Sequence, residues 1–157
     1  MSEQFQACSQ ELAAALADRL PLWVEESVER VMRAWSGSVP DEVSVQARAA
    51  GEQARDAVGG AIHELLAADL DHQRTTPLAL LRSAVRYPTA VLRAAGVPPV
   101  ERDDFATAAF PEDDYDLAPA SFTDFAPALS ELGIRWGAAK AFEHKRRHPR
   151  PPAAGRG

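Results

Sequence analysis

Residues 43–68 read VSVQARAAGEQARDAVGGAIHELLAA, and this stretch decides the fold class. Apolar side chains, most of them small, recur in it every three or four residues, which is the period of one face of an α-helix. These positions are Val43, Ala47, Ala50, Ala54, Ala57, Ala61, Leu65 and Ala68. Because alanine is small, a facing helix can approach closely. We therefore predict a long helix that packs tightly on its neighbours, with either a bend or a very close backbone contact at Gly59-Gly60.

Helical periodicity also covers the residues before this stretch. We predict one helix over residues 5–20 and a second over residues 21–35, because proline suits the first turn of a helix. Ser36-Gly37 is typical of a helix end. Trp35 continues the apolar stripe of the second helix, so we expect it in the core.

Another helix is predicted after residue 75. Thr76-Pro77 is typical of a helix start, Pro88 predicts a break at Tyr87, and Gly96 predicts the end. Short connections favour antiparallel neighbours. The sequence thus predicts an all-α fold, an irregular antiparallel bundle of about five helices in a single domain over residues 1–148.

Residues 97–131, called the arm below, fit neither a helical nor a strand period. The arm holds five prolines, five aromatic residues and nine acids, with Arg102 as its one basic residue. Only Ser121–Asp124 resembles a capping box, opening a short helix to about Leu132. Either the aromatic residues of the arm plug the helical core, or the arm folds onto a partner.

Helix is predicted to resume after Gly133. Its core-facing positions are expected at Ile134, Ala138, Ala141 and Phe142. The helix ends in a basic turn, and residues 149–157 are predicted to form a disordered basic tail. Residues 132–157 hold seven basic residues and one acid, so acidic and basic blocks follow each other in the chain. These blocks either attract each other or bind an external partner.

Known catalytic and ligand-binding motifs are missing from the sequence. No nucleophile elbow, phosphate-binding glycine loop or calcium-loop pattern occurs. The two histidine groupings, around His63 and His72 and at His144 with His148, lack the partner residues of a metal site. We therefore predict no catalytic, cofactor or metal residues, and we lean against an enzyme. A sequence pI of about 5.2 argues against a nucleic-acid partner.

Cysteine content and hydropathy suggest a compartment. Cys8 is the sole cysteine, and no secretory signal or membrane-spanning apolar run is evident. The 31 alanines, and the 15 arginines among 17 basic residues, are typical of a GC-rich genome. We expect a soluble bacterial protein of the cytoplasm.

The leading hypothesis is a non-catalytic protein–protein interaction or regulatory module that uses the arm and the basic C-terminal turn. Another protein is the expected partner, and a homo-oligomer is a possible one. The predicted contact residues are Phe105, Phe110, Asp113, Asp114, Tyr115, Asp116, Trp136, Lys145, Arg146 and Arg147. The alternative is a small helical enzyme or ligand-binding bundle, with a pocket against the alanine-rich helix.

Overall fold

The computed structural model describes residues 3–67, 77–127 and 129–147, and all regular secondary structure in these ranges is helical. The protein is therefore all-α, as the periodicity predicts. The elements are α1 (Glu3–Ser36), α2 (Asp41–Ala54), the π-helical turn η1 (Arg55–Gly59), α3 (Gly60–Ala67), α4 (Pro77–Ser83), α5 (Arg86–Ala94), α6 (Asp104–Ala109), α7 (Phe122–Phe125) and α8 (Leu129–Arg147). None of these helices is long and apolar enough to cross a lipid bilayer.

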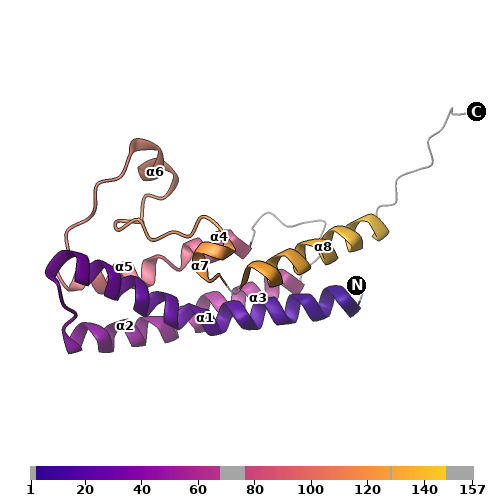
Figure 1. Ribbon diagram of the computed structural model, residues 1–157, viewed down its shortest axis with the longest axis horizontal. Helices are drawn as coiled ribbons and strands as arrows, with labels where there is room; N and C mark the ends of the chain where they lie inside the picture. The colour runs from indigo at the N-terminus through magenta and orange to yellow at the C-terminus, as the bar shows by residue number, and fades with distance from the viewer. Residues whose placement is uncertain (1–2, 68–76, 128, 148–157) are drawn as a thin grey trace, which may run out of the picture.

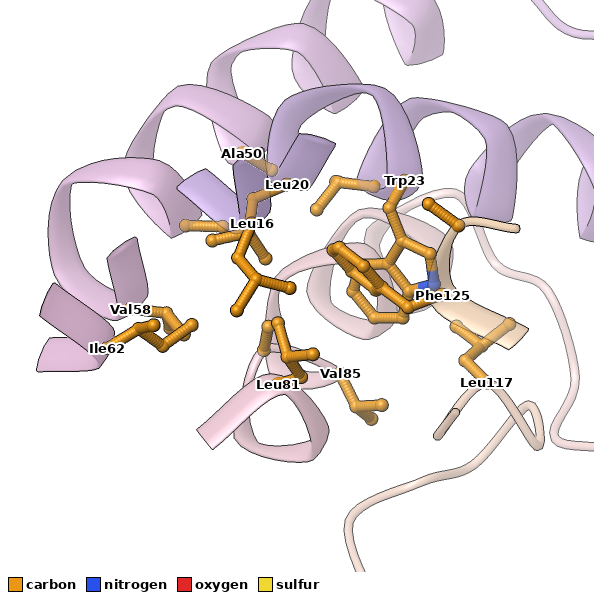
Figure 2. Packing of buried hydrophobic residues seen from close by; sticks show 14 of the residues in the cluster. Leu16, Leu20, Trp23, Ala50, Val58, Ile62, Leu81, Val85, Leu117 and Phe125 are labelled. Carbon is orange, nitrogen blue, oxygen red and sulfur yellow. The ribbon is translucent and has the colours of Figure 1, made fainter. Parts of the chain in front are cut away.

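The long helix α1 organises the molecule. It runs along most of the long axis, and α2, η1 and α3 return beside it (Figure 1). The helices α5 and α8 also contact α1, and α5 contacts α2 as well. The resulting core is a continuous cluster, part of which is shown in Figure 2, where Leu16 and Leu20 of α1 face Leu81 of α4 and Ile62 of α3.

The prediction of two helices on either side of Pro21 is wrong, because α1 is one helix with Pro21 inside it. A proline in a helix interior costs about 3 kcal/mol. The side chains around it, including Leu16, Leu20, Val24 and Val28, are fully or almost fully buried on one face. Each such burial stabilises the fold by about 1.5–3 kcal/mol, so packing on both sides of Pro21 outweighs its cost.

The same stripe explains why Trp35 is exposed, although the sequence predicts that it lies in the core. Steps of four residues carry the buried face from Val24 through Val28 to Met32. Trp35 lies off this face, in the last turn of α1, and its side chain is 49% exposed. The helix then ends at Gly37, which has a positive φ of 83°, so the predicted stop is confirmed.

The alanine-rich helix packs as closely on α1 as its composition suggests. A Cβ added at Gly51 would lie 2.9 Å from the Cα of Pro21, and one at Gly59 would lie 3.1 Å from the Cβ of Ala17. The very close contact expected at Gly59 is thus present. The π-helical turn η1 ends at this residue, and such a turn adds one residue to the helical repeat.

We predict opposite effects for two glycine substitutions in this region. Gly51→Ala should lower the free energy of unfolding by about 1–3 kcal/mol, because the added methyl group meets the backbone of Pro21. Gly60→Ala should raise it by about 0.5–1 kcal/mol, because a Cβ there meets nothing within 4 Å and the backbone is already helical. Urea unfolding of both variants checks this. A stable Gly51→Ala variant would contradict the close approach of α2 to α1.

The break between the fourth and fifth α-helices does not lie where the sequence predicts it. The break between α4 and α5 falls at Ala84-Val85, before the predicted Tyr87. Pro88 then lies in the first turn of α5, where its missing N–H needs no partner. Gly96 ends this region with a positive φ of 80°, as predicted. The cap at Thr76 lies outside the described residues, although α4 does begin at Pro77.

The helix α8 begins at Leu129, before Gly133, and presents a different face to the core from the one predicted. Trp136, Ala139 and Glu143 are buried together with Leu129. Trp136 is the largest side chain of the helix, and burying it removes more apolar area from water than burying alanines does. The predicted core positions Ile134, Ala138, Ala141 and Phe142 are exposed. The predicted tail, residues 149–157, lies outside the described residues.

Candidate functional site

The arm is divided into two parts of different character. Residues 113–125, the anchored half, hold most of the buried side chains of the arm. Residues 101–112, called the acidic knob below, stand away from the bundle (Figure 1) and include the short helix α6. The prediction that no helix occurs in the arm before residue 121 is therefore wrong at α6, a single turn and a half that is too short to give a clear period.

The anchored half begins with a buried aspartate. Asp113 is 2% exposed, and its two carboxylate oxygens accept hydrogen bonds from the backbone N–H groups of Leu117 (2.7 Å) and Ala118 (2.9 Å). These bonds hold the turn after residue 113, in which Asp116 has a positive φ of 56°. Asp113 therefore shapes the chain, and its carboxylate is not presented to a partner.

Tyr115 is held inside the fold as well. Its side chain is buried, and its hydroxyl donates a hydrogen bond to the carbonyl of Val97 at 2.7 Å. Burial raises the pKa of the phenol, the neighbouring Asp114 carboxylate raises it further, and Arg93 opposes these effects. The neutral phenol is thus the form that the folded chain favours.

A pH-dependent loss of stability follows from the raised pKa of Tyr115. As the pH rises above about 10, the unfolded chain loses the phenolic proton while the folded chain keeps it, so the free energy of unfolding falls. Tyr115→Phe should cost about 1 kcal/mol at pH 7, where the bond to Val97 is intact, and less above pH 10. Urea unfolding of both chains at pH 7, 9 and 10.5 measures this difference. A difference that grows above pH 10 would contradict it.

The far end of the anchored half is an aromatic contact. The ring centroids of Phe125 and Trp23 lie 5.6 Å apart with the ring planes tilted by 40°, and Figure 2 shows the pair at one side of the core with Leu117 beyond. The predicted capping box is present in part before it. The N–H of Asp124 donates to the hydroxyl of Ser121 at 3.2 Å, but the carboxylate of Asp124 accepts from the N–H of Ala120 at 3.1 Å instead of that of Ser121. The short helix ends at Phe125, earlier than the predicted Leu132.

The acidic knob is a closed loop with its own internal support. At its neck the N–H of Val100 donates to the carbonyl of Asp114 at 2.9 Å, so the two ends of the loop meet. Arg93 of α5 pairs with the Asp114 carboxylate at 2.6 Å beside this neck. Loops of this size whose ends lie together are frequently functional.

Both ends of α6 are capped from within the knob. Asp103 accepts a hydrogen bond from the N–H of Ala106 at 2.6 Å, and Arg102 donates to the carbonyl of Phe110 at 2.7 Å. No residue of α6 is buried, and Phe105 is 80% exposed at its surface. The knob also carries four exposed acids: Glu101, Asp103, Asp104 and Glu112.

A cleft of about 400 Å³ lies between the base of the knob and the helices α4 and α5. Phe110, which is half-buried, lines it, and the guanidinium of Arg82 lies 5.3 Å from the centre of that ring. The same guanidinium donates from Nε to the carbonyl of Pro119 at 3.0 Å. Arg82 thus connects α4 to the knob at Phe110 and to the anchored half at Pro119.

The pocket expected against the alanine-rich helix has a different character. Ala47, Ala50 and Ala54 of α2 are buried in the core. The hollow of about 280 Å³ beside them is lined mainly by polar residues, among them Glu25, Glu29, Arg33 and Arg48. In residues 3–67, 77–127 and 129–147 no group of three or more His, Cys, Asp or Glu residues is placed to hold a metal ion.

The predicted contact residues of α8 divide between core and surface. Trp136 is buried, and its indole N–H donates to the hydroxyl of Ser9 at 3.1 Å. Lys140 lies over that ring at 5.0 Å, and burial lowers the pKa of its ammonium. Lys145 and Arg146 are exposed, and Arg146 pairs with Glu143 at 2.7 Å. The side chain of Arg147 lies outside the described residues.

The structure does not bring the ten predicted contact residues together. The knob and the end of α8 lie toward opposite ends of the long axis (Figure 1). Phe105, Asp116 and Lys145 are exposed, whereas Asp113, Tyr115 and Trp136 are buried. The acidic carboxylate of Asp114 pairs with Arg93 of α5 rather than with the basic end.

Some positions that support the knob were not singled out from the sequence. Arg82, Arg93 and Arg102 attach it or cap it, and each lies far in sequence from some of its partners or in an irregular segment. The sequence shows the acids of the knob only as part of the acidic composition of the arm, and it does not indicate that they lie on a separate loop. Comparisons with protein-family models, with curated proteins and with solved structures found no match to this chain.

Proposed function

We propose that this chain is a non-catalytic protein-interaction module, and that the acidic knob is its contact surface. The single observation that carries the proposal is Phe105, which is 80% exposed on a helix that buries none of its residues. A phenyl ring gains about 1.5–3 kcal/mol when it is buried, and this fold leaves that gain unused. Caps at both ends of α6 nevertheless hold the helix that carries this ring.

The charge around Phe105 defines the partner in chemical terms. The knob carries four acids and one arginine, and Arg102 is engaged at the C-terminal end of α6. We expect a protein with a basic surface that surrounds an apolar pocket for the phenyl ring. Opposite charges of this kind accelerate association and make it sensitive to salt.

The basic residues at the end of α8, Lys145, Arg146 and Arg147, belong to the proposal as a separate patch. The distance between the two patches in Figure 1 makes them separate contacts rather than one surface. We place the module in a bacterial cytoplasm, which the lone Cys8 and the arginine-rich composition support.

Site-specific photo-crosslinking tests the knob. A benzoylphenylalanine at position 105 should give one discrete crosslinked product in cells, because the ring is held against the partner. The same group at Ala90, which is exposed on α5, is the control and should give none. Neutralising the knob by Glu101→Gln, Asp104→Asn and Glu112→Gln should weaken the product without changing the helical circular dichroism. Equal products at positions 105 and 90, or no product at 105, would overturn the proposal.

A further inference from the structure

The helix α8 has an outer face that is built like a core face. Ile134 and Phe142 are 70% and 61% exposed, and Ala138 lies midway between them on the same side of the helix. Four-residue steps along a helix place side chains on one face. The sequence pattern predicts that this face is buried, and the single chain leaves it open to water.

The outer face is symmetric about Ala138. Ile134 precedes Ala138 by four residues and Phe142 follows it by four, while Glu131 precedes it by seven and Lys145 follows it by seven. All five side chains are exposed. If a second α8 is laid antiparallel across this face with its Ala138 opposite the first, Ile134 meets Phe142 of the other copy, and Glu131 meets Lys145. Each of these contacts then occurs twice, as a two-fold axis requires.

We infer that two copies of this chain associate through an antiparallel pair of α8 helices, with Ala138 at the two-fold axis. The small side chain at the centre lets the two helices approach closely. Beside it, a hollow of about 700 Å³ between α1 and α8, lined by Ala7, Cys8 and Ala138 among others, offers room for a side chain of the partner.

The charge of the outer face selects a second copy over the acidic knob as its occupant. Glu131 at one end of the face would repel the carboxylates of the knob, whereas it attracts Lys145 of an antiparallel α8. Arg146, next to Lys145 at the other end of α8, is paired with Glu143 within its own helix. The charges of the outer face are thus more complementary to a second copy of that face than to the knob.

The pair of α8 helices is a small interface, so we expect a reversible dimer with a dissociation constant in roughly the micromolar range. The inference does not rest on the proposed function, because the knob lies outside the interface. A dimer presents two acidic knobs, and a partner with two sites would bind it with higher avidity than a single chain.

A charge exchange tests the antiparallel pairing. Glu131→Lys and Lys145→Glu should each raise the dissociation constant about fivefold, because each loses two opposite-charge pairs. The double variant should return to within about twofold of the original chain, since its pairs are restored in reversed order. The two residues are fourteen positions apart on one helix and do not meet within a chain, so the restoration reports an intermolecular contact. Sedimentation at about 1–200 µM gives the constants.

The matched control is Glu29→Arg, which breaks the exposed pair of Glu29 with Arg33 on α1 without touching α8. It should leave the dissociation constant unchanged. Circular dichroism shows whether each variant keeps its helices. A monomer at about 200 µM, or single variants that associate as the original chain does, would overturn the inference. A double variant that stays as weak as the singles would also overturn it.

A cysteine at the axis gives an independent readout. In a Cys8→Ser chain, Ala138→Cys should form a disulfide-linked dimer on mild oxidation, because a residue at a two-fold axis faces its own copy. Ala90→Cys in the same background should remain monomeric. If the knob of one chain covered α8 of another instead, Ala138→Cys would link to Phe105→Cys in a mixture and not to itself, and the inference would fail.

Discussion

Phe125→Ala is expected to lower the free energy of unfolding by about 3–5 kcal/mol, a large share of the stability of a domain of this size. The side chain is 1% exposed, and it packs on Trp23 of α1. Its removal leaves a cavity where the anchored half of the arm meets the core. Urea unfolding followed by circular dichroism measures the change.

Phe105→Ala is the matched control for Phe125→Ala, because the two residues are phenylalanines of the same arm. Phe105 is mostly exposed, so its truncation should change the free energy of unfolding by less than about 0.5 kcal/mol. Similar losses in the two variants would contradict the division of the arm into an anchored half and a knob.

Asp113→Ala is expected to cost about 2–4 kcal/mol, because it leaves the backbone N–H groups of Leu117 and Ala118 without their acceptor. The neighbouring Asp114→Ala should cost less than about 1 kcal/mol. Asp114 makes an ion pair with Arg93, whose side chain is largely exposed, and such pairs contribute little. Thermal or urea unfolding compares the two adjacent aspartates.

The outcome that would count against this account of Asp113 is a pair of variants with equal stability. In that case the two N–H groups would find water instead, and the turn at residues 113–118 would not depend on the carboxylate. Asp113→Asn is a useful third chain, since its amide oxygen can accept one of the two bonds and should recover part of the loss.

Helix class and several boundaries could be predicted from the sequence, because they depend on local chemistry. Glycines that end helices, at residues 37 and 96, and the alanine face of α2 are examples. Pro21 could not be read correctly from local preference. Its helix continues because residues far along the chain, such as Gly51, pack against it. A local sequence pattern does not show how strongly residues that are distant in the chain pack together.

For the candidate site, the sequence indicates a segment, but it does not distinguish the exposed residues of that segment from the buried ones. Composition marks the arm as acidic and aromatic, yet it cannot separate Asp113, which bonds to backbone N–H groups, from the exposed Asp104. The outer face of α8 shows the reverse case. Its period predicts burial, but the side chains of this face are exposed, because Trp136 on another face occupies the core of this chain.

The central claim is that the knob is a contact surface and not a part of the fold. The neck bond from Val100 to Asp114 allows residues 101–112 to be replaced by Gly-Ser-Gly with the loop ends kept together. The most direct measurement is an affinity capture from lysate with this chain and the original chain as baits, after the urea midpoint of each has been measured. We predict that the chain with the replaced knob folds, and that it no longer captures one stoichiometric, salt-sensitive protein partner that the original chain captures. A bait that keeps the same partner, or that no longer folds, would contradict the claim.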